Sequence, residues 1–243
     1  MSPITFAHRG ARRDEPENTL PAFVRGRELG ASGLESDVWL AADGVPVLVH
    51  DAVVRRGLRR IRIGAETASD LAAYGIPSLA ALYGTCGVDY ELSLDLKDPH
   101  AADAVLAVAR DAGALHRLWL CHPDTGLLAD LRRRSPEVRL VHSDRKDRIG
   151  PAYERHAYDL ATAGIDAMNL HHTEWTKGFM ALFHRFGVRT FAWDVQEVRH
   201  LRAMLGMGAD ALYSDAVARL VGVVAEFATV PAQNGTDASD EPA

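Results

Sequence analysis

Residues 90–97 read Tyr-Glu-Leu-Ser-Leu-Asp-Leu-Lys, a stretch in which apolar and polar side chains alternate strictly. Successive side chains of a β-strand point to opposite faces, so the polar ones share a face: Glu91, Ser93, Asp95 and Lys97. A buried parallel strand is usually an almost continuous apolar run. A strand with four polar residues on one face is therefore expected to line a wet or charged space.

Seven further strand-like runs lie before and after this stretch, and segments with apolar residues at helical spacing separate them. The predicted runs are Ile4–Ala7, Gly33–Leu40, Arg117–Cys121, Arg139–Ser143, Ala167–Leu170, Arg189–Trp193 and Ala211–Tyr213. Eight strands, each followed by a helix, predict a (β/α)₈ TIM barrel that forms one domain over residues 1–228. A doubly wound open sheet is the alternative, but no glycine-rich nucleotide motif follows the first strand.

Two segments depart from the repeat. Residues 42–44 (Ala-Asp-Gly) predict a hairpin turn, after which residues 45–49 return as an antiparallel strand. A short insertion follows over residues 52–74; it carries five arginines between positions 55 and 62, interpreted as a solvated loop that could attract anionic substrates. Residues 229–243 are rich in Pro, Asn, Gly, Ser and acidic residues and are expected to be disordered.

The composition excludes several classes of protein. The chain has 243 residues, of which 47% are hydrophobic and 25% charged, and its net charge of −6 provides no basic surface for a nucleic acid. No apolar run reaches membrane-spanning length, and the N-terminus lacks the layout of a secretory signal, so we expect a cytoplasmic location. Two cysteines, Cys86 and Cys121, are too few for a disulfide framework.

Titratable residues gather at the C-terminal ends of the predicted strands, where TIM barrels hold their active sites. Glu35 and Asp37 share one face of a strand, and Asp95 lies on another strand. Converging carboxylates repel one another, and oxygen ligands of this kind suit Mg²⁺ or Ca²⁺. The alternative is a salt-bridge cluster of the three carboxylates with Arg9 and Lys97, without a metal.

Other polar residues near these ends are given structural roles. Asn18 and Thr19 are N-cap candidates for the first helix. His122, His171 and His172 are interpreted as cavity lining or as structural histidines.

The order of the motifs along the chain resembles the glycerophosphodiester phosphodiesterase family. The motifs are His8-Arg9-Gly10, Pro16-Glu17-Asn18-Thr19, Glu35-Ser36-Asp37, Asp43-Gly44, His50-Asp51, Ile76-Pro77-Ser78-Leu79, Asp95-Leu96-Lys97, Trp193, Gly208-Ala209-Asp210 and Ser214-Asp215. Each motif alone is weak, whereas the ordered set is highly specific. The resemblance implies a phospholipase-C-like TIM-barrel phosphodiesterase that uses a divalent metal, Mg²⁺ or Ca²⁺, and releases an alcohol and glycerol 3-phosphate.

The resemblance also implies the catalytic and metal-binding residues. His8 and His50 correspond to an acid/base pair, which suits imidazoles because they titrate near neutral pH. Glu35, Asp37 and Asp95 correspond to the metal ligands, and Asp95 stands where the family usually has glutamate.

Contacts to the substrate follow from the same resemblance. Arg9 and Lys97 correspond to contacts with the phosphate, Trp193 to a wall of the substrate pocket, and Glu17 to a glutamate near the metal. The expected partner is a small-molecule phosphodiester.

Two other functions remain open from the sequence. One is a phospholipase D-like hydrolase of lysophospholipids or sphingolipids, which would need exposed apolar loops near the pocket. The other is a non-catalytic binder of phosphorylated ligands, which would be expected to lack one of the two histidines. The sequence does not define the headgroup of the substrate or the oligomeric state.

Overall fold

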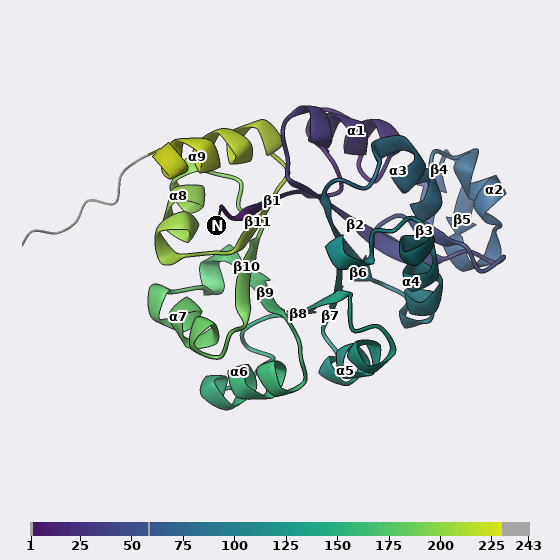
Figure 1. Cartoon of the computed structure of the whole chain (residues 1–243). Coiled ribbons are helices and arrows are strands. Elements are labelled where there is room, and N and C mark those ends of the chain that lie inside the picture. The colour runs from purple at the N-terminus through teal and green to yellow at the C-terminus, as the bar shows by residue number, and fades with distance from the viewer. Residues whose placement is uncertain (1, 58, 230–243) are drawn as a thin grey trace, which may run out of the picture.

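The structure is a computed structural model that describes residues 2–57 and 59–229. Eight parallel strands form a closed barrel, because β1 is hydrogen-bonded to both β11 and β2 (Figure 1). In chain order the barrel strands are β1 (Ile4–Ala7), β2 (Gly33–Leu40), β6 (Glu91–Leu96), β7 (Leu118–His122), β8 (Arg139–Ser143), β9 (Ala167–His171), β10 (Arg189–Trp193) and β11 (Ala211–Ser214). The closed ring confirms the predicted TIM barrel and excludes the open sheet.

Helices form the outer layer around this ring (Figure 1). They are α1 (Leu20–Glu28), α3 (Leu79–Cys86), α4 (Ala102–Asp111), α5 (Thr125–Arg134), α6 (Tyr153–Thr162), α7 (Lys177–Arg185), α8 (Val198–Met207) and α9 (Val217–Thr229), with short 3₁₀ turns η1 (Ile63–Ala65), η2 (Pro99–Ala101), η3 (Leu115–Arg117) and η4 (His172–Glu174). Thr229 ends α9, so the segment expected to be disordered begins inside a helix, and its remainder, 230–243, lies outside the described residues. None of the described helices is long and apolar enough to cross a membrane.

The insertion after β2 forms a small unit on one side of the barrel (Figure 1). Strand β3 (Pro46–Leu48) returns antiparallel to β2, as predicted. The arginine-rich segment is a β-hairpin of β4 (Val53–Arg56) and β5 (Arg59–Arg62) rather than a loop, followed by α2 (Ala68–Ala72). Ile61, Ile63 and Leu71 bury one side of this unit, and their apolar contacts explain why the segment is ordered.

The two faces of β6 show how the barrel is filled. Its leucines point outward into the apolar layer beneath the helices. On the inner face, aromatic rings fill the lower part of the barrel, where Phe6 stacks on Tyr213 with ring centroids 4.6 Å apart. Glu91 lies in this lower part and accepts a hydrogen bond from Trp119 Nε1 at 2.6 Å. The polar residues of β6 therefore lie at different heights along the barrel axis. Glu91 lies in the lower part of the barrel, and Asp95 lies nearer the C-terminal end of the strand.

Gly33, at the start of β2, allows two strands to approach closely. A Cβ atom there would lie 2.5 Å from the Phe6 ring and 3.0 Å from the carbonyl oxygen of Glu91. We expect Gly33→Ala to lower the free energy of unfolding by about 1–3 kcal/mol, because the stacked Phe6 ring cannot move aside freely.

Gly84→Ala is the matched control, because Gly84 lies inside α3 with no neighbouring atom within 4 Å of its added Cβ. This change should leave stability unchanged or raise it by up to about 1 kcal/mol. Thermal unfolding of both variants measures the difference, and equal melting temperatures would contradict the close approach at Gly33.

Candidate active site

One cavity of about 430 Å³ opens at the C-terminal ends of the barrel strands. It is lined by all eight site residues predicted from the sequence: His8, Arg9, Glu35, Asp37, His50, Asp95, Lys97 and Trp193. Among the described residues of the insertion 52–74, none lines this cavity. A larger hollow lies around Ile4 and Trp119 at the opposite end of the barrel, where no comparable cluster of carboxylates is present among the described residues.

Three carboxylates converge at the centre of the cavity. Glu35 and Asp37 come from β2, and Asp95 faces Asp37 across the parallel pairing of β2 with β6. Each of the three side chains offers an oxygen within 4.8 Å of the other two. Lys97 Nζ lies 3.0 Å from Asp37 Oδ1 and 3.1 Å from Asp95 Oδ2, so this ammonium offsets part of the negative charge.

Burial divides these carboxylates into two electrostatic classes. Burial raises the pKa of Glu35 to about 7, a shift that His8 opposes and that the charges of Asp37 and Asp95 reinforce. Burial also disfavours the charged form of Asp37, but the nearby cations of Lys97 and Arg9 outweigh it and lower its pKa. Glu35 is thus the member of the cluster that lacks sufficient positive charge.

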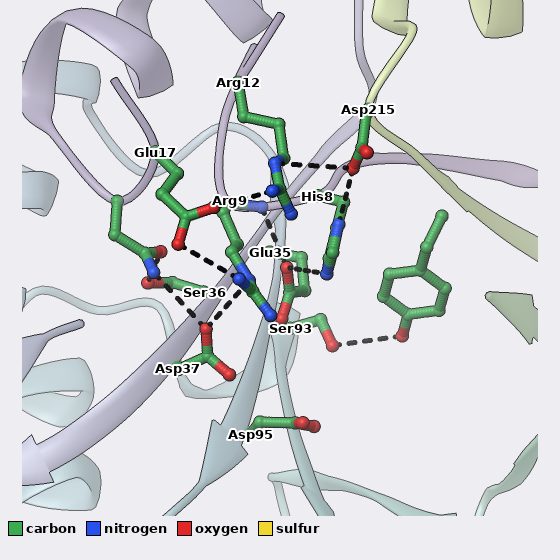
Figure 2. Close-up of polar contacts among 12 residues, drawn as sticks. His8, Arg9, Arg12, Glu17, Glu35, Ser36, Asp37, Ser93, Asp95 and Asp215 are labelled. Atoms are coloured by element: carbon green, nitrogen blue, oxygen red, sulfur yellow. Dashed lines mark hydrogen bonds and ion pairs between the residues drawn. The ribbon is translucent and has the colours of Figure 1, made fainter. Parts of the chain in front are cut away.

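The two candidate catalytic histidines share one arrangement. His8 Nδ1 lies 2.7 Å from Asp215 Oδ1, and His50 Nδ1 lies 2.8 Å from Asp51 Oδ1 (His8 is shown in Figure 2). A carboxylate can only accept, so Nδ1 carries the proton in both rings and Nε2 remains for chemistry. His8 Nε2 lies 3.8 Å from Glu35 Oε2.

The charges around His8 favour its protonated form. Burial alone would lower the pKa of His8, but the carboxylates of Glu35 and Asp215 outweigh it and raise the pKa. The sequence motifs included Asp215 without a role for it, although its place directly after the last barrel strand indicates this end of the barrel.

Arg9 connects the first strand to the carboxylates. Its backbone N–H donates to Glu35 Oε2 at 2.9 Å, and its guanidinium lies 3.2 Å from Asp37 Oδ2 and 3.0 Å from Glu17 Oε1 (Figure 2). Arg9 has a positive φ of 56°, which turns its amide toward Glu35. Glu17 therefore pairs with Arg9 and Arg12, and it is not a member of the three-carboxylate cluster.

Asn18 is not a helix cap. Thr19 caps α1 by accepting from the amide of Ala22, whereas Asn18 is buried and has a φ of 56°. The Asn18 side chain donates to Asp37 Oδ2 at 3.3 Å and accepts from Ser36 Oγ at 2.7 Å. The hydrogen bond from Asn18 orients the Asp37 carboxylate. Asparagine suits this position because it is one of the few residues that adopt a positive φ readily.

The wall of the cavity opposite the carboxylates is mixed in character. The Arg145 guanidinium lies 4.8 Å from the centre of the Trp193 ring. Asn169, from β9, donates to Ser143 Oγ at 3.1 Å, while its buried Oδ1 has no hydrogen-bond partner among the described residues. A buried acceptor in a cavity wall can accept a hydrogen bond from a hydroxyl group or water.

The donor set of the cluster fits a hard divalent cation. All three groups supply carboxylate oxygen, which is the ligand type of Mg²⁺ and Ca²⁺. The raised pKa of Glu35 shows that a further positive charge would be stabilised beside it. The three carboxylates therefore fit a divalent cation better than they fit the alternative of a salt-bridge cluster without a metal.

A TIM barrel with a polar cavity and paired histidines at its C-terminal end has the architecture of an enzyme. Residues 8–84 match the model of the Glycerophosphoryl diester phosphodiesterase family. A glycerophosphodiester phosphodiesterase of Caldanaerobacter subterraneus is 24% identical over 92% of this chain and 98% of its own length. Glycerophosphodiester phosphodiesterase 1 of Bos taurus is 52% identical over 51 residues, which cover 21% of this chain and 15% of the relative.

Solved structures agree with the fold. The glycerophosphodiester phosphodiesterase of Thermotoga maritima superposes with a TM-score of 0.81 at 23% identity, over 92% of this chain and 99% of that one. A phosphodiesterase of Oleispira antarctica in complex with sn-glycerol-3-phosphate gives a TM-score of 0.78 at 20% identity, over 92% and 97% of the two chains. The chain is therefore similar to glycerophosphodiester phosphodiesterases over most of its length, and the match to the family model covers residues 8–84.

Asn18 provides a test of how the cluster is supported. Asn18→Ala should weaken binding of a divalent cation by about 10–100-fold, because the hydrogen bond that orients Asp37 is lost. Asn18→Gly relieves the backbone strain but not the lost hydrogen bond, so its stability should exceed that of Asn18→Ala while its metal affinity stays equally low.

Calorimetric metal titration and thermal unfolding separate these two effects. Wild-type metal affinity in both variants would contradict the role of Asn18.

Proposed function

We propose that the chain hydrolyses glycerophosphodiesters to an alcohol and glycerol 3-phosphate, with two histidines as acid and base and with a divalent metal, Mg²⁺ or Ca²⁺. The observation that carries the proposal is the pair of imidazoles in one cavity, each held by a carboxylate on Nδ1. His8 follows β1 and His50 follows β3, and both line the cavity that contains the three carboxylates.

Glu35, Asp37 and Asp95 would hold the metal in this proposal. When bound, the metal supplies positive charge that offsets the negative charge of a phosphodiester and of its transition state. Lys97 and Arg9 lie beside the same carboxylates and present their remaining N–H groups to a phosphate in the cavity.

The histidines move the protons. The Nε2 atom of one imidazole accepts the proton of the attacking hydroxyl group, and the Nε2–H of the other donates a proton to the leaving oxygen. Asp215 and Asp51 keep His8 and His50 in the tautomer that these steps require. The raised pKa of His8 favours His8 as the donor.

The wall of the cavity favours a hydrophilic substrate. The free acceptor of Asn169 suits a hydroxyl group such as those of glycerol. A lysolipid hydrolase would be expected to expose apolar residues at the mouth, but the large exposed apolar residues of the described chain are Val88, Tyr158 and Phe227, and none lines the cavity. Product analysis with glycerophosphodiesters and lysolipids tests this preference directly.

Replacement of either histidine tests the acid/base pair. His8→Ala and His50→Ala should each lower kcat by at least about 100-fold and remove one limb of a bell-shaped pH–rate profile. Metal affinity and thermal stability should stay near those of the wild type, which calorimetry and thermal unfolding measure.

His122→Ala is the matched control, because His122 ends a neighbouring strand but does not line the cavity. Its kcat should stay within about twofold of the wild type. A His50→Ala variant that retains more than about a tenth of wild-type kcat would exclude the two-histidine mechanism.

The pKa of Glu35 predicts how metal binding depends on pH. A group whose folded-state pKa is raised to about 7 holds its proton below that pH, and the proton competes with the metal. Metal affinity should therefore rise about tenfold between pH 6 and pH 8 and level off above it, as measured by calorimetry.

Two variants make this measurement specific. Glu35→Gln should lose the pH dependence together with most of the affinity. Asp95→Asn should weaken both metal binding and activity, with partial recovery in excess metal. Full activity after exhaustive treatment with EDTA would contradict the metal requirement.

A further inference from the structure

A second group of metal-ligand side chains lies at the same end of the barrel, outside the three-carboxylate cluster. His171, His172 and Asp194 offer two imidazole nitrogens and a carboxylate oxygen, all within 4.8 Å of one another. We propose that these three residues form a rim site for a divalent transition-metal cation of the Zn²⁺ or Co²⁺ type. The site is distinct from the candidate Mg²⁺ or Ca²⁺ site in position and in ligand chemistry.

The barrel register brings the ligands together. His171 ends β9 opposite Trp193 at the end of β10, so Asp194, the next residue, lies beside His171. Asp194 has a φ of 60°, an uncommon backbone conformation for an aspartate. Gln196 donates to Asp194 Oδ1 at 3.1 Å, which leaves Oδ2 pointing to His171 Nε2 at 3.2 Å.

Both ring nitrogens of His171 have partners, and metal binding at Nε2 would change the tautomer of the ring. His171 Nδ1 accepts from the backbone N–H of Thr173 at 3.4 Å and lies 2.7 Å from Thr173 Oγ1, so Nε2 carries the ring proton and donates to Asp194 Oδ2. Histidines bound to zinc usually donate their second N–H to a nearby acceptor. On metal binding the ring would take the other tautomer, with Nδ1–H donating to Thr173 Oγ1 and with Nε2 and Asp194 Oδ2 bound to the cation.

A further imidazole lies within reach of the group. The ring of His172 has its centroid 4.5 Å from that of His171 on one side and 4.5 Å from that of His200, on α8, on the other. The rings of His171, His172 and His200 are only partly buried. The side chain of His172 can therefore rotate without displacing core residues. Ligand atoms of a tetrahedral zinc site lie roughly 3.4 Å apart, and a side-chain rotation closes the remaining gap.

The ligand types separate the two sites chemically. Imidazole nitrogen favours zinc, cobalt, nickel and copper ions, whereas an all-carboxylate set favours magnesium and calcium ions. A protein saturated with Mg²⁺ should therefore still bind Zn²⁺ at the rim. The Trp193 ring lies 4.6 Å from the His171 ring and provides a nearby fluorescent reporter.

The test is a Zn²⁺ titration of the full chain in excess Mg²⁺, followed by calorimetry, with Co²⁺ as a second probe read by its visible absorption. We expect one Zn²⁺ to bind, and we expect His171→Ala and His172→Ala each to weaken it by at least about tenfold. Asp37→Asn, which removes a carboxylate of the other cluster, should leave this binding unchanged. Co²⁺ should quench Trp193, and Trp193→Phe should remove that part of the quenching.

The control is His122→Ala, which removes a histidine at the end of a neighbouring strand and should bind Zn²⁺ as the wild type does. Circular dichroism checks that each variant is folded. Zinc binding that is lost in Asp37→Asn but kept in His171→Ala and His172→Ala would overturn the proposal. Absence of Zn²⁺ binding to the Mg²⁺-loaded wild type would also overturn it. Neither result bears on phosphodiester hydrolysis, which the histidine variants His8→Ala and His50→Ala test separately.

Discussion

The repulsion among three carboxylates determines the arrangement of the upper barrel. Glu35 and Asp37 are 5% and 2% exposed, so water cannot screen their charges as it does at a surface. Lys97 and Arg9 compensate Asp37 closely, yet Glu35 keeps a pKa of about 7. The cluster therefore lacks positive charge beside Glu35. A cation that binds there is stabilised by the carboxylates that the fold holds together.

The fold maintains this deficit through backbone geometry. Parallel pairing of β2 with β6 places Asp37 beside Asp95, and closure of the barrel by β1 brings the amide of Arg9 to Glu35. Asn18 adds a hydrogen bond to Asp37 from a loop. These contacts are set by strand register and by uncommon backbone conformations, so the carboxylates cannot move apart to relieve their repulsion without breaking several hydrogen bonds.

Much of this arrangement could be predicted from the sequence, because strand periodicity and strand ends are local properties. The eight strands and the end of the barrel that carries the cavity follow from such patterns. The role of Asn18 could not be predicted, because an asparagine just before a helix is typical of an N-cap and the sequence does not indicate its positive φ. Alternation predicts that Glu91 and Asp95 share a face of the strand, but it does not indicate their height along the barrel axis. The sequence predicts a loop for the arginine-rich hairpin, because the apolar contacts that order it come from residues distant in sequence.

Histidine–carboxylate pairs recur around the cavity with different consequences. In His8–Asp215 and His50–Asp51 the carboxylate meets Nδ1, which leaves Nε2 for proton transfer. In His171–Asp194 the carboxylate meets Nε2, while Nδ1 contacts the hydroxyl group and the backbone N–H of Thr173, so a metal at the proposed rim site would displace the proton of Nε2. The same two residue types thus suit acid/base chemistry or metal binding according to which ring nitrogen faces the carboxylate. The ring nitrogen that faces the carboxylate therefore separates the proposed catalytic pair from the proposed rim site.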